Sequence, residues 1–254
     1  MVFLHSGGGM ASDWSRVFRA MGPGFHCLAI DLYGYGKTQA LSDSRSPVKI
    51  DDHAHLILEL ARLKGGPVHV VGHSFGGAVA LRGAILWPRE FATLTLIEPQ
   101  ALPLLEETRD PLFDRVVAFR EQFDSVVLND GDASAMRLFV DHYSGEGFFD
   151  GLPGSASQIL TELAGVVAGS WSALMQNPIP VASLEHLDVP TVVVQGSETL
   201  PPERRMCEIL LCELPFVQAA VVEGAGHMSP MTHPRQVAAA ITRHLHAAPP
   251  NPRT

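Results

Sequence analysis

The sequence has few cysteines, and none of them fits a metal-binding or disulfide pattern. Its 254 residues include three, Cys27, Cys207 and Cys212. The number is odd and the spacing matches no zinc site. We therefore expect three reduced, mostly buried thiols and a cytoplasmic protein, because disulfides persist in oxidising compartments.

Long apolar runs and clusters of basic residues are also missing. No run approaches the length of a membrane-spanning helix, and Met1 to Gly9 lack the charged start and apolar centre of a signal peptide. The chain carries 18 Lys and Arg residues against 27 Asp and Glu residues, a formal net charge of −9. Because phosphate binding needs clustered positive charge, we expect neither a nucleic-acid partner nor a membrane partner.

What the sequence does contain is an alternation of short apolar runs with helical patterns. Hydrophobic residues make up 46% of the chain and charged residues 18%, which is the composition of a folded globular protein. Six runs are apolar throughout, as strands covered on both faces should be. The predicted strands are Val2–Leu4, Cys27–Ile30, Val68–Val71, Leu94–Ile97, Thr191–Val194 and Ala219–Val222.

Five segments beside these runs combine helical apolar spacing with recognisable ends. First-turn acids, a proline at the first position or a glycine after the last turn mark them. The predicted helices are Trp14–Met21, Asp51–Lys64, Phe75–Trp87, Pro202–Leu214 and Pro234–His246. This alternation predicts an α/β fold with a mostly parallel sheet and helices on both faces.

The alternation breaks once, between about residues 101 and 187, where no strand is predicted. Apolar residues there repeat with helical spacing in three stretches, Phe113–Phe123, Met136–Tyr143 and Ile159–Val167. We therefore predict a helical insertion at 101–187 that covers one end of the sheet. The predicted core domain consists of residues 1–100 and 188–254.

The sharpest motif is G-x-S-x-G, formed by Gly72 to Gly76. The pattern alone is weak in a chain with 23 glycines. Its placement is specific, because it directly follows a predicted strand and opens a predicted helix, as a nucleophile elbow requires. The tight turn needs glycine where a Cβ would clash, and the helix N-terminus under Ser74 favours developing negative charge.

With this elbow, the chain resembles the α/β-hydrolase superfamily over nearly its whole length. Three further segments match the family's pattern in the right order: a glycine-rich loop at 5–9, a D-x-x-G-x-G-x-[ST] segment at 31–38 and a histidine loop at 224–234. The resemblance implies a serine-nucleophile, esterase-like hydrolase whose insertion is a helical cap. It also implies a two-stranded hairpin before the first predicted strand. This sequence begins on that strand, so we expect either that this member lacks the hairpin or that the chain start is truncated.

The resemblance assigns roles to four residues. Ser74 matches the nucleophile, and His227 matches the base that the serine hydroxyl needs. The amides of Gly7 and of Phe75, the residue after the nucleophile, match the oxyanion hole. The residue before Gly7 is a serine where the family has glycine, which is a departure from the pattern.

The acid of the implied triad has two candidates. At the family's usual position, three residues after Gly196, the sequence has Thr199, which cannot be an anion. Glu98 follows the predicted strand Leu94–Ile97, where some family members carry their acid, and Glu198 lies one residue from the usual position. We expect Glu98 to be the acid, with Glu198 as the alternative, and either choice keeps the order serine, acid, histidine.

The other histidines near these motifs are expected to be structural. His73 adjoins the nucleophile, and the side chain at this position of an elbow points away from the serine. Surface or helix-capping positions are expected for His53, His55, His233, His244 and His246.

The function that the resemblance implies is hydrolysis of a small carboxylic ester or lactone through an acyl-enzyme on Ser74, with no metal or organic cofactor. Aromatic residues of the insertion should help to line an apolar pocket for this small-molecule substrate. Two alternatives remain open: carbon–carbon bond hydrolysis on the same triad, and a ligand receptor or signalling protein with slow turnover. We expect a monomer or a homodimer.

Overall fold

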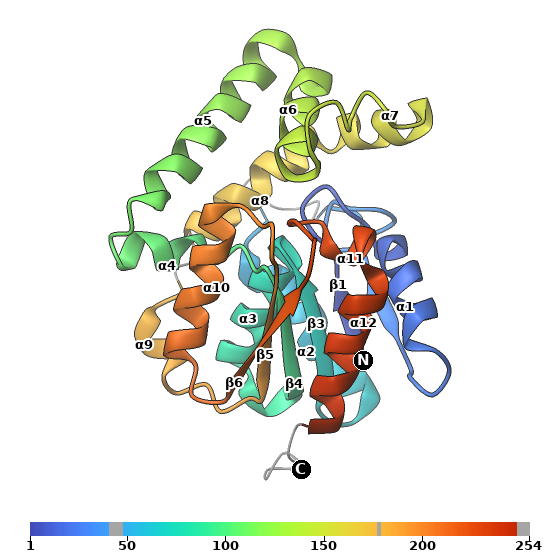
Figure 1. Cartoon of the computed structure of the whole chain (residues 1–254), viewed down its shortest axis with the longest axis vertical. Coiled ribbons are helices and arrows are strands. Elements are labelled where there is room, and N and C mark those ends of the chain that lie inside the picture. Colours follow the sequence, from blue (N-terminus) through green and yellow to red (C-terminus); the bar gives the residue numbers. More distant parts are fainter. Residues whose placement is uncertain (41–47, 177–178, 248–254) are drawn as a thin grey trace.

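The computed structural model describes residues 1–40, 48–176 and 179–247, which form a parallel sheet between layers of helices (Figure 1). In these residues the sheet has six strands in the order β2-β1-β3-β4-β5-β6, and all neighbouring pairs are parallel. The strands are β1 (Val2–Leu4), β2 (Leu28–Ile30), β3 (Val68–His73), β4 (Phe91–Ile97), β5 (Thr191–Gly196) and β6 (Val217–Val222). All six predicted runs are strands, and the predicted α/β-hydrolase architecture is confirmed.

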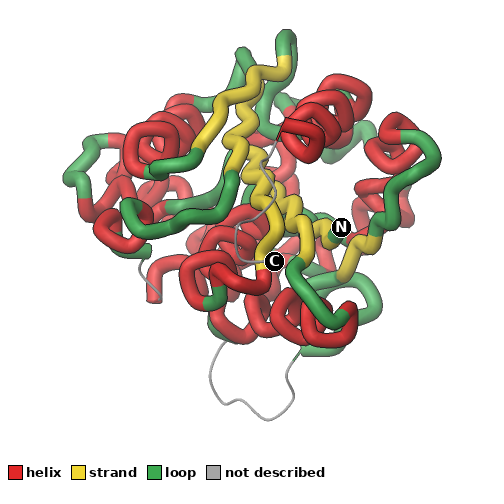
Figure 2. Tube along the Cα trace, turned by 90° about the horizontal axis from the view of Figure 1, so that it is seen from below, coloured by secondary structure: helices red, strands yellow, loops and turns green. Residues whose placement is uncertain are grey.

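Helices cover both faces of this sheet, as the view from below shows (Figure 2). One face carries α1 (Ser15–Met21), preceded by the 3-10 turn Ala11–Trp14, and α12 (Pro234–Ala247); the other carries α2 (Ile50–Lys64), α3 (Phe75–Leu86) and α10 (Pro201–Glu213). Val70 and Val71, successive residues of β3, are fully buried in the two opposite cores. Successive residues of a strand point to opposite faces, so a strand covered on both sides is apolar throughout.

The helical insertion lies between β4 and β5 and spans one end of the sheet (Figure 1). Its helices are α4 (Leu102–Glu107), α5 (Leu112–Asp130), α6 (Asp132–Ser144), α7 (Gly154–Glu162), α8 (Ala164–Gln176) and α9 (Val181–Leu184). The insertion was predicted, and whether it is a cap domain separate from a core of 1–100 and 188–254 stays a prediction. In the part of the chain that the structure describes, no helix is both long and apolar enough to cross a membrane.

One predicted helix of the insertion is wrong. The stretch Ile159–Val167 is divided between two helices, since α7 ends before Leu163 and α8 begins after it. The reason is packing. No residue of α7 is buried, whereas Val167 and Trp171 of α8 are buried in the main core, and one straight helix could not serve both surfaces.

Some expected exposures are also wrong. Cys207 is buried, but Cys27 is only partly buried and Cys212 is exposed, so the thiols are not mostly buried. Two histidines expected at the surface or at helix caps are buried instead. His53 packs edge-on against Phe75 with ring centroids 5.2 Å apart, and Nε2 of His244 donates to the carbonyl of Pro190 at 3.2 Å.

The burial of α3 can be tested with two leucines. Leu81 on α3 is fully buried, whereas Leu63 near the end of α2 is 83% exposed. We expect Leu81→Ala to lower the free energy of unfolding by about 2–5 kcal/mol, because it leaves a cavity in the core. The matched control Leu63→Ala should change it by less than about 0.5 kcal/mol. Urea denaturation measures both values, and equal effects would contradict the interior position of α3.

Candidate active site

Ser74 lies in a tight turn between β3 and α3, at the carboxyl edge of the sheet. Its backbone is in the left-handed region, with φ 54°, a conformation that is costly for a residue other than glycine. A Cβ on Gly72 would collide with the carbonyl of Gly76, and a Cβ on Gly76 would collide with the carbonyl of His5. Both glycines are therefore required where the turn touches neighbouring backbone.

Backbone hydrogen bonds hold this turn against the adjacent strands. The amide of Ser74 donates to the carbonyl of Ile97 at 3.0 Å, and the carbonyl of Ser74 accepts from the amide of Gln100 at 3.1 Å. The amide of Gly76 donates to the carbonyl of His5 at 3.1 Å. The backbone that carries the serine hydroxyl is thus fixed from both sides.

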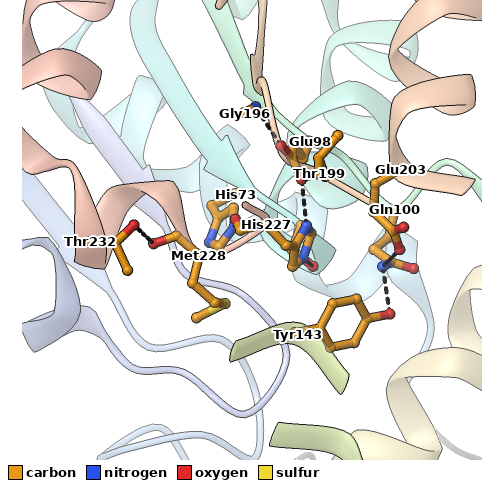
Figure 3. A network of polar contacts seen from close by, with 11 residues as sticks. His73, Glu98, Gln100, Tyr143, Gly196, Thr199, Glu203, His227, Met228 and Thr232 are labelled. Atoms are coloured by element: carbon orange, nitrogen blue, oxygen red, sulfur yellow. Dashed lines mark hydrogen bonds and ion pairs between the residues drawn. The ribbon is translucent and has the colours of Figure 1, made fainter. Parts of the chain in front are cut away.

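The structure brings Ser74, His227 and Glu98 into one hydrogen-bonded chain. Nε2 of His227 lies 3.0 Å from Oγ of Ser74. Nδ1 of His227 lies 2.7 Å from Oε2 of Glu98 (Figure 3). The exposed fractions are 6% for Ser74, 3% for His227 and 0% for Glu98. The three residues follow β3, β6 and β4, and parallel strands present their carboxyl ends at one edge of the sheet.

The alternative acid, Glu198, is not part of this chain. It is exposed, and its side chain makes no hydrogen bond or ion pair among the described residues. Thr199, at the position where an aspartate was expected, supports Glu98 instead. Its hydroxyl donates to Oε2 of Glu98 at 2.6 Å, and the amide of Gly196 donates to Oε1 at 2.6 Å. The carboxylate from β4 is therefore held by the loop after β5.

The pKa values of Glu98 and His227 shift in opposite directions. Burial disfavours the charged carboxylate, but the hydrogen bonds from His227, Thr199 and Gly196 outweigh it, and the pKa of Glu98 lies below its ordinary value. Burial also lowers the pKa of His227, yet the hydrogen bond and charge of Glu98 outweigh that effect and raise it above its ordinary value. An imidazole in this setting can take the proton of a serine hydroxyl while the carboxylate stabilises the imidazolium.

Gly7 and Phe75 both line the cavity beside Ser74. Phe75 is the first residue of α3, so its amide has no acceptor within the helix. The amide of Gly7 donates to no backbone carbonyl among the described residues. Unpaired amides beside a serine hydroxyl are the donors that a developing oxyanion requires. Ser6, which departs from the family's pattern, has no left-handed backbone and so adds no strain.

The cavity itself is small and mostly apolar. Its volume is about 290 Å³ when its opening to solvent is included. The insertion contributes Phe139, Tyr143, Trp171 and further apolar residues to its wall, whereas Phe148, another aromatic residue of the insertion, is exposed. Among the residues that the structure describes, no group of three or more His, Cys, Asp or Glu side chains is arranged to hold a metal ion.

Two aromatic side chains contact the ring of His227, and the sequence did not reveal either contact. The ring centroids lie 5.0 Å from His73 and 4.6 Å from Tyr143. Nε2 of His73 donates to the backbone carbonyl of His227 at 2.9 Å and so ties the histidine loop to β3. Burial lowers the pKa of His73 to about 3, which keeps this ring neutral.

Sequence reasoning also missed Gln100 and Glu203. Gln100 lines the cavity two residues after Glu98, and this closeness was the only available signal. Glu203 lies in the first turn of α10, where an acidic residue is typical of an exposed helix start. Its exposed fraction is nevertheless only 3%.

The contact between the turn and β1 can be tested with one glycine. We expect Gly76→Ala to lower the free energy of unfolding by about 1–3 kcal/mol or more, because the new methyl group meets the backbone at His5. Gly66→Ala is the control, since a Cβ there meets nothing within 4 Å. Thermal melts compare the two, and a Gly76→Ala variant as stable as the control would contradict the close approach.

Comparison with known proteins agrees with this fold. Residues 1–240 match the family model described as the alpha/beta hydrolase family. Monoacylglycerol lipase ABHD6 of Mus musculus is 24% identical over 259 residues, which cover 96% of this chain and 75% of that protein. Lipase LipV of Mycobacterium tuberculosis is 29% identical over 241 residues, covering 91% of this chain and 87% of the lipase.

Solved structures share the fold as well. The crystal structure of a hydrolase from Pseudomonas aeruginosa PA01 superimposes with a TM-score of 0.78 at 19% identity, covering 97% of this chain and 89% of that one. The strand order, the motif at Ser74 and the family match over most of the length agree with one another. The chain therefore belongs to the alpha/beta hydrolase family and is a hydrolase of that fold.

Proposed function

We propose that this protein hydrolyses a small carboxylic ester or lactone through an acyl-enzyme on Ser74. The observation that carries the proposal is the buried chain of hydrogen bonds from Ser74 through His227 to Glu98. A serine hydroxyl is a poor nucleophile unless a base takes its proton, and this arrangement supplies the base together with a carboxylate behind it. A cytoplasmic location, inferred from the three free cysteines, is part of the same proposal.

The first half of the reaction transfers the acyl group to the protein. Oγ of Ser74 attacks the carbonyl carbon while its proton passes to Nε2 of His227. The negative charge on the carbonyl oxygen is held by the amides of Gly7 and Phe75. The ester C–O bond then breaks, and His227 returns its proton to the leaving alcohol oxygen.

The second half releases the acid. Water gives a proton to His227 and attacks the acyl carbon, and Ser74 leaves with that proton. Throughout the cycle Glu98 stays ionised, fixes the tautomer of His227 and stabilises its imidazolium form. His227 returns each proton that it accepts, so the proposed reaction needs no cofactor.

The role of Ser74 is tested by covalent labelling and by turnover. We expect a serine-directed phosphonate probe to modify Ser74 once per chain, because the neighbouring base activates its hydroxyl. Ser74→Ala should abolish the label and lower kcat by roughly 10⁴ to 10⁶. Mass spectrometry locates the label, and a panel of esters and diketone-like substrates measures turnover.

Three outcomes would count against the proposal. Labelling that survives in Ser74→Ala would move the nucleophile elsewhere. Turnover of diketone-like substrates without turnover of esters would favour carbon–carbon bond hydrolysis. Stoichiometric labelling with no multiple turnover of any substrate would favour a receptor role.

The acid is tested with a matched pair of glutamates and with pH. We expect Glu98→Gln to lower kcat by about 10² to 10⁴, because the imidazolium loses its buried counter-charge. Glu198→Gln, at an exposed position, should change kcat less than about tenfold. The reverse ranking, in variants shown by thermal melts to be equally folded, would assign the role to Glu198.

The pH dependence of kcat/KM tests the pairing of His227 with Glu98 independently. His227 works as a base only when it is neutral, so kcat/KM should fall as the pH drops through its pKa. Because Glu98 raises that pKa, the acidic limb of the wild type should lie above pH 6.5, the ordinary value for histidine. In Glu98→Gln the limb should move to lower pH, and a limb that stays in place would contradict the coupling.

A further inference from the structure

The wall of the cavity beside Ser74 has an apolar part and a polar part. Val167, Trp171 and Leu174 from α8 form much of the apolar part. Ser170, also in the wall, is already satisfied, since its hydroxyl contacts Oη of Tyr35 at 2.7 Å and donates to the carbonyl of Val166 at 2.9 Å. Apart from Ser74 and the amides of Gly7 and Phe75, the residues of the wall with polar side chains that remain are Gln100 and Tyr143.

These two side chains form a cluster with Glu203 (Figure 3). Nε2 of Gln100 donates to Oη of Tyr143 at 3.1 Å and to Oε1 of Glu203 at 3.4 Å. The three residues come from the loop after β4, from α6 and from α10. The exposed fractions of Gln100 and Glu203 are 4% and 3%, so these two side chains are almost closed to solvent, whereas Tyr143 is partly buried.

Two oxygen atoms of the cluster have no hydrogen-bond partner among the described residues. They are Oε1 of Gln100 and Oε2 of Glu203, and both are fully buried. Buried polar atoms in proteins are nearly always paired, because an unpaired one forfeits its hydration without compensation. Oε1 of Gln100 accepts, whereas Oε2 of Glu203 accepts when the carboxyl is ionised and can donate when it is protonated. A hydroxyl, which both donates and accepts, can therefore pair with either atom.

Gln100 and Tyr143 place the cluster at the cavity wall, and Tyr143 lies on its histidine side. The ring of Tyr143 is 4.6 Å from that of His227. Where Glu203 is ionised, it adds to the effect of Glu98 in raising the pKa of His227. In the proposed reaction His227 protonates the leaving alcohol, so the alcohol part of an ester must lie on this side. The apolar wall from α8 is then left for the acyl part.

We propose that Gln100, Tyr143 and Glu203 form a subsite for a hydroxyl group on the alcohol part of the ester substrate. The inference rests on the proposed hydrolysis at Ser74 and specifies its substrate class: esters whose leaving alcohol carries a second hydroxyl. A hydroxyl suits the cluster better than an ammonium group. Two of its members are neutral, and burial raises the pKa of the third, Glu203, which favours its uncharged form.

The central experiment compares two esters of equal size, 2-hydroxyethyl butanoate and propyl butanoate. We expect kcat/KM to be at least about tenfold higher for the hydroxyethyl ester, because a site built to bind a hydroxyl leaves its own polar groups unpaired with the analogue that lacks it. Glu203 also acts on His227, but that effect is common to both esters. The ratio of the two kcat/KM values therefore isolates recognition of the hydroxyl.

Variants test whether the preference for the hydroxyethyl ester arises from the cluster. Gln100→Met and Glu203→Met keep side-chain length and remove the unpaired oxygen atoms, so the ratio should fall towards one in each. Tyr143→Phe keeps the ring against His227 and removes only the hydroxyl, and it should lower the ratio in the same direction. Glu198→Gln is the control, because that carboxylate is exposed on the loop after β5 and should leave the ratio as in the wild type. Circular dichroism and thermal melts establish that each variant is folded.

Further esters test the position and the charge of the donor. Propyl 3-hydroxybutanoate carries its hydroxyl on the acyl part and should gain little over propyl butanoate; a larger gain than that of the hydroxyethyl ester would overturn the assignment to the alcohol side. 2-(Dimethylamino)ethyl butanoate carries a cation, and a preference for it over the hydroxyethyl ester would overturn the choice of a hydroxyl.

The outcomes separate this inference from the proposed function. A ratio near one in the wild type, with hydrolysis that depends on Ser74, would overturn the subsite alone, and the cluster would then only tie α6 to the core. The same conclusion follows if the wild-type ratio is high and both methionine variants keep it. Hydrolysis that survives in Ser74→Ala would overturn the proposed function, whatever the ratio. Because the wild-type ratio requires no variant, misfolding of a variant does not rescue the inference.

Discussion

The close approach of backbone at the carboxyl edge of the sheet is the constraint on which the site depends. The turn at Ser74 is hydrogen-bonded to the end of β4 and, through Gly76, to the residue after β1. The amide of Glu98 in turn donates to the carbonyl of Val194 on β5 at 3.0 Å. Ser74 and Glu98 both have left-handed backbones at these junctions. A strained backbone persists only where the surrounding structure holds it in place. Here the hydrogen bonds that join β1, β3, β4 and β5 at this edge hold it.

The same edge of the sheet explains how the acid can follow either of two strands, β4 or β5. β4 and β5 are neighbours, with Ile97 opposite Val194, so a carboxylate after either strand can reach the same histidine. In this chain Glu98 takes that place, and the hydroxyl of Thr199 from the β5 loop donates to it. A residue that cannot be an anion thus still contributes a donor that favours the ionised carboxylate. The two positions act as one site assembled from two loops.

Features that depend on residues close together in the sequence were predicted, and features that depend on distant residues were not. The strands, the five longer helices beside them and the turn at Ser74 depend on spacing within a few residues, and these were predicted. The break at Leu163 was not, because it is decided by which surface α8 buries. The contact of Tyr143 with His227 joins residues far apart in the chain, and the burial of Glu203 depends on what α6 and the β4 loop place over α10. No local pattern encodes such contacts.

The core and the insertion contribute different things to the cavity. Ser74, His227, Glu98 and the two amides all come from loops of the sheet, whose positions the strand ends fix. The insertion supplies most of the cavity wall and, through Tyr143, a ring against His227. A change in the insertion can therefore alter which molecule fits without moving the serine, the histidine or the carboxylate. Gln100, in the loop after β4, connects the two parts. Its backbone amide donates to the carbonyl of Ser74, and its Nε2 donates to Oη of Tyr143. Through Gln100, the wall that the insertion forms is joined by hydrogen bonds to the turn that carries the serine.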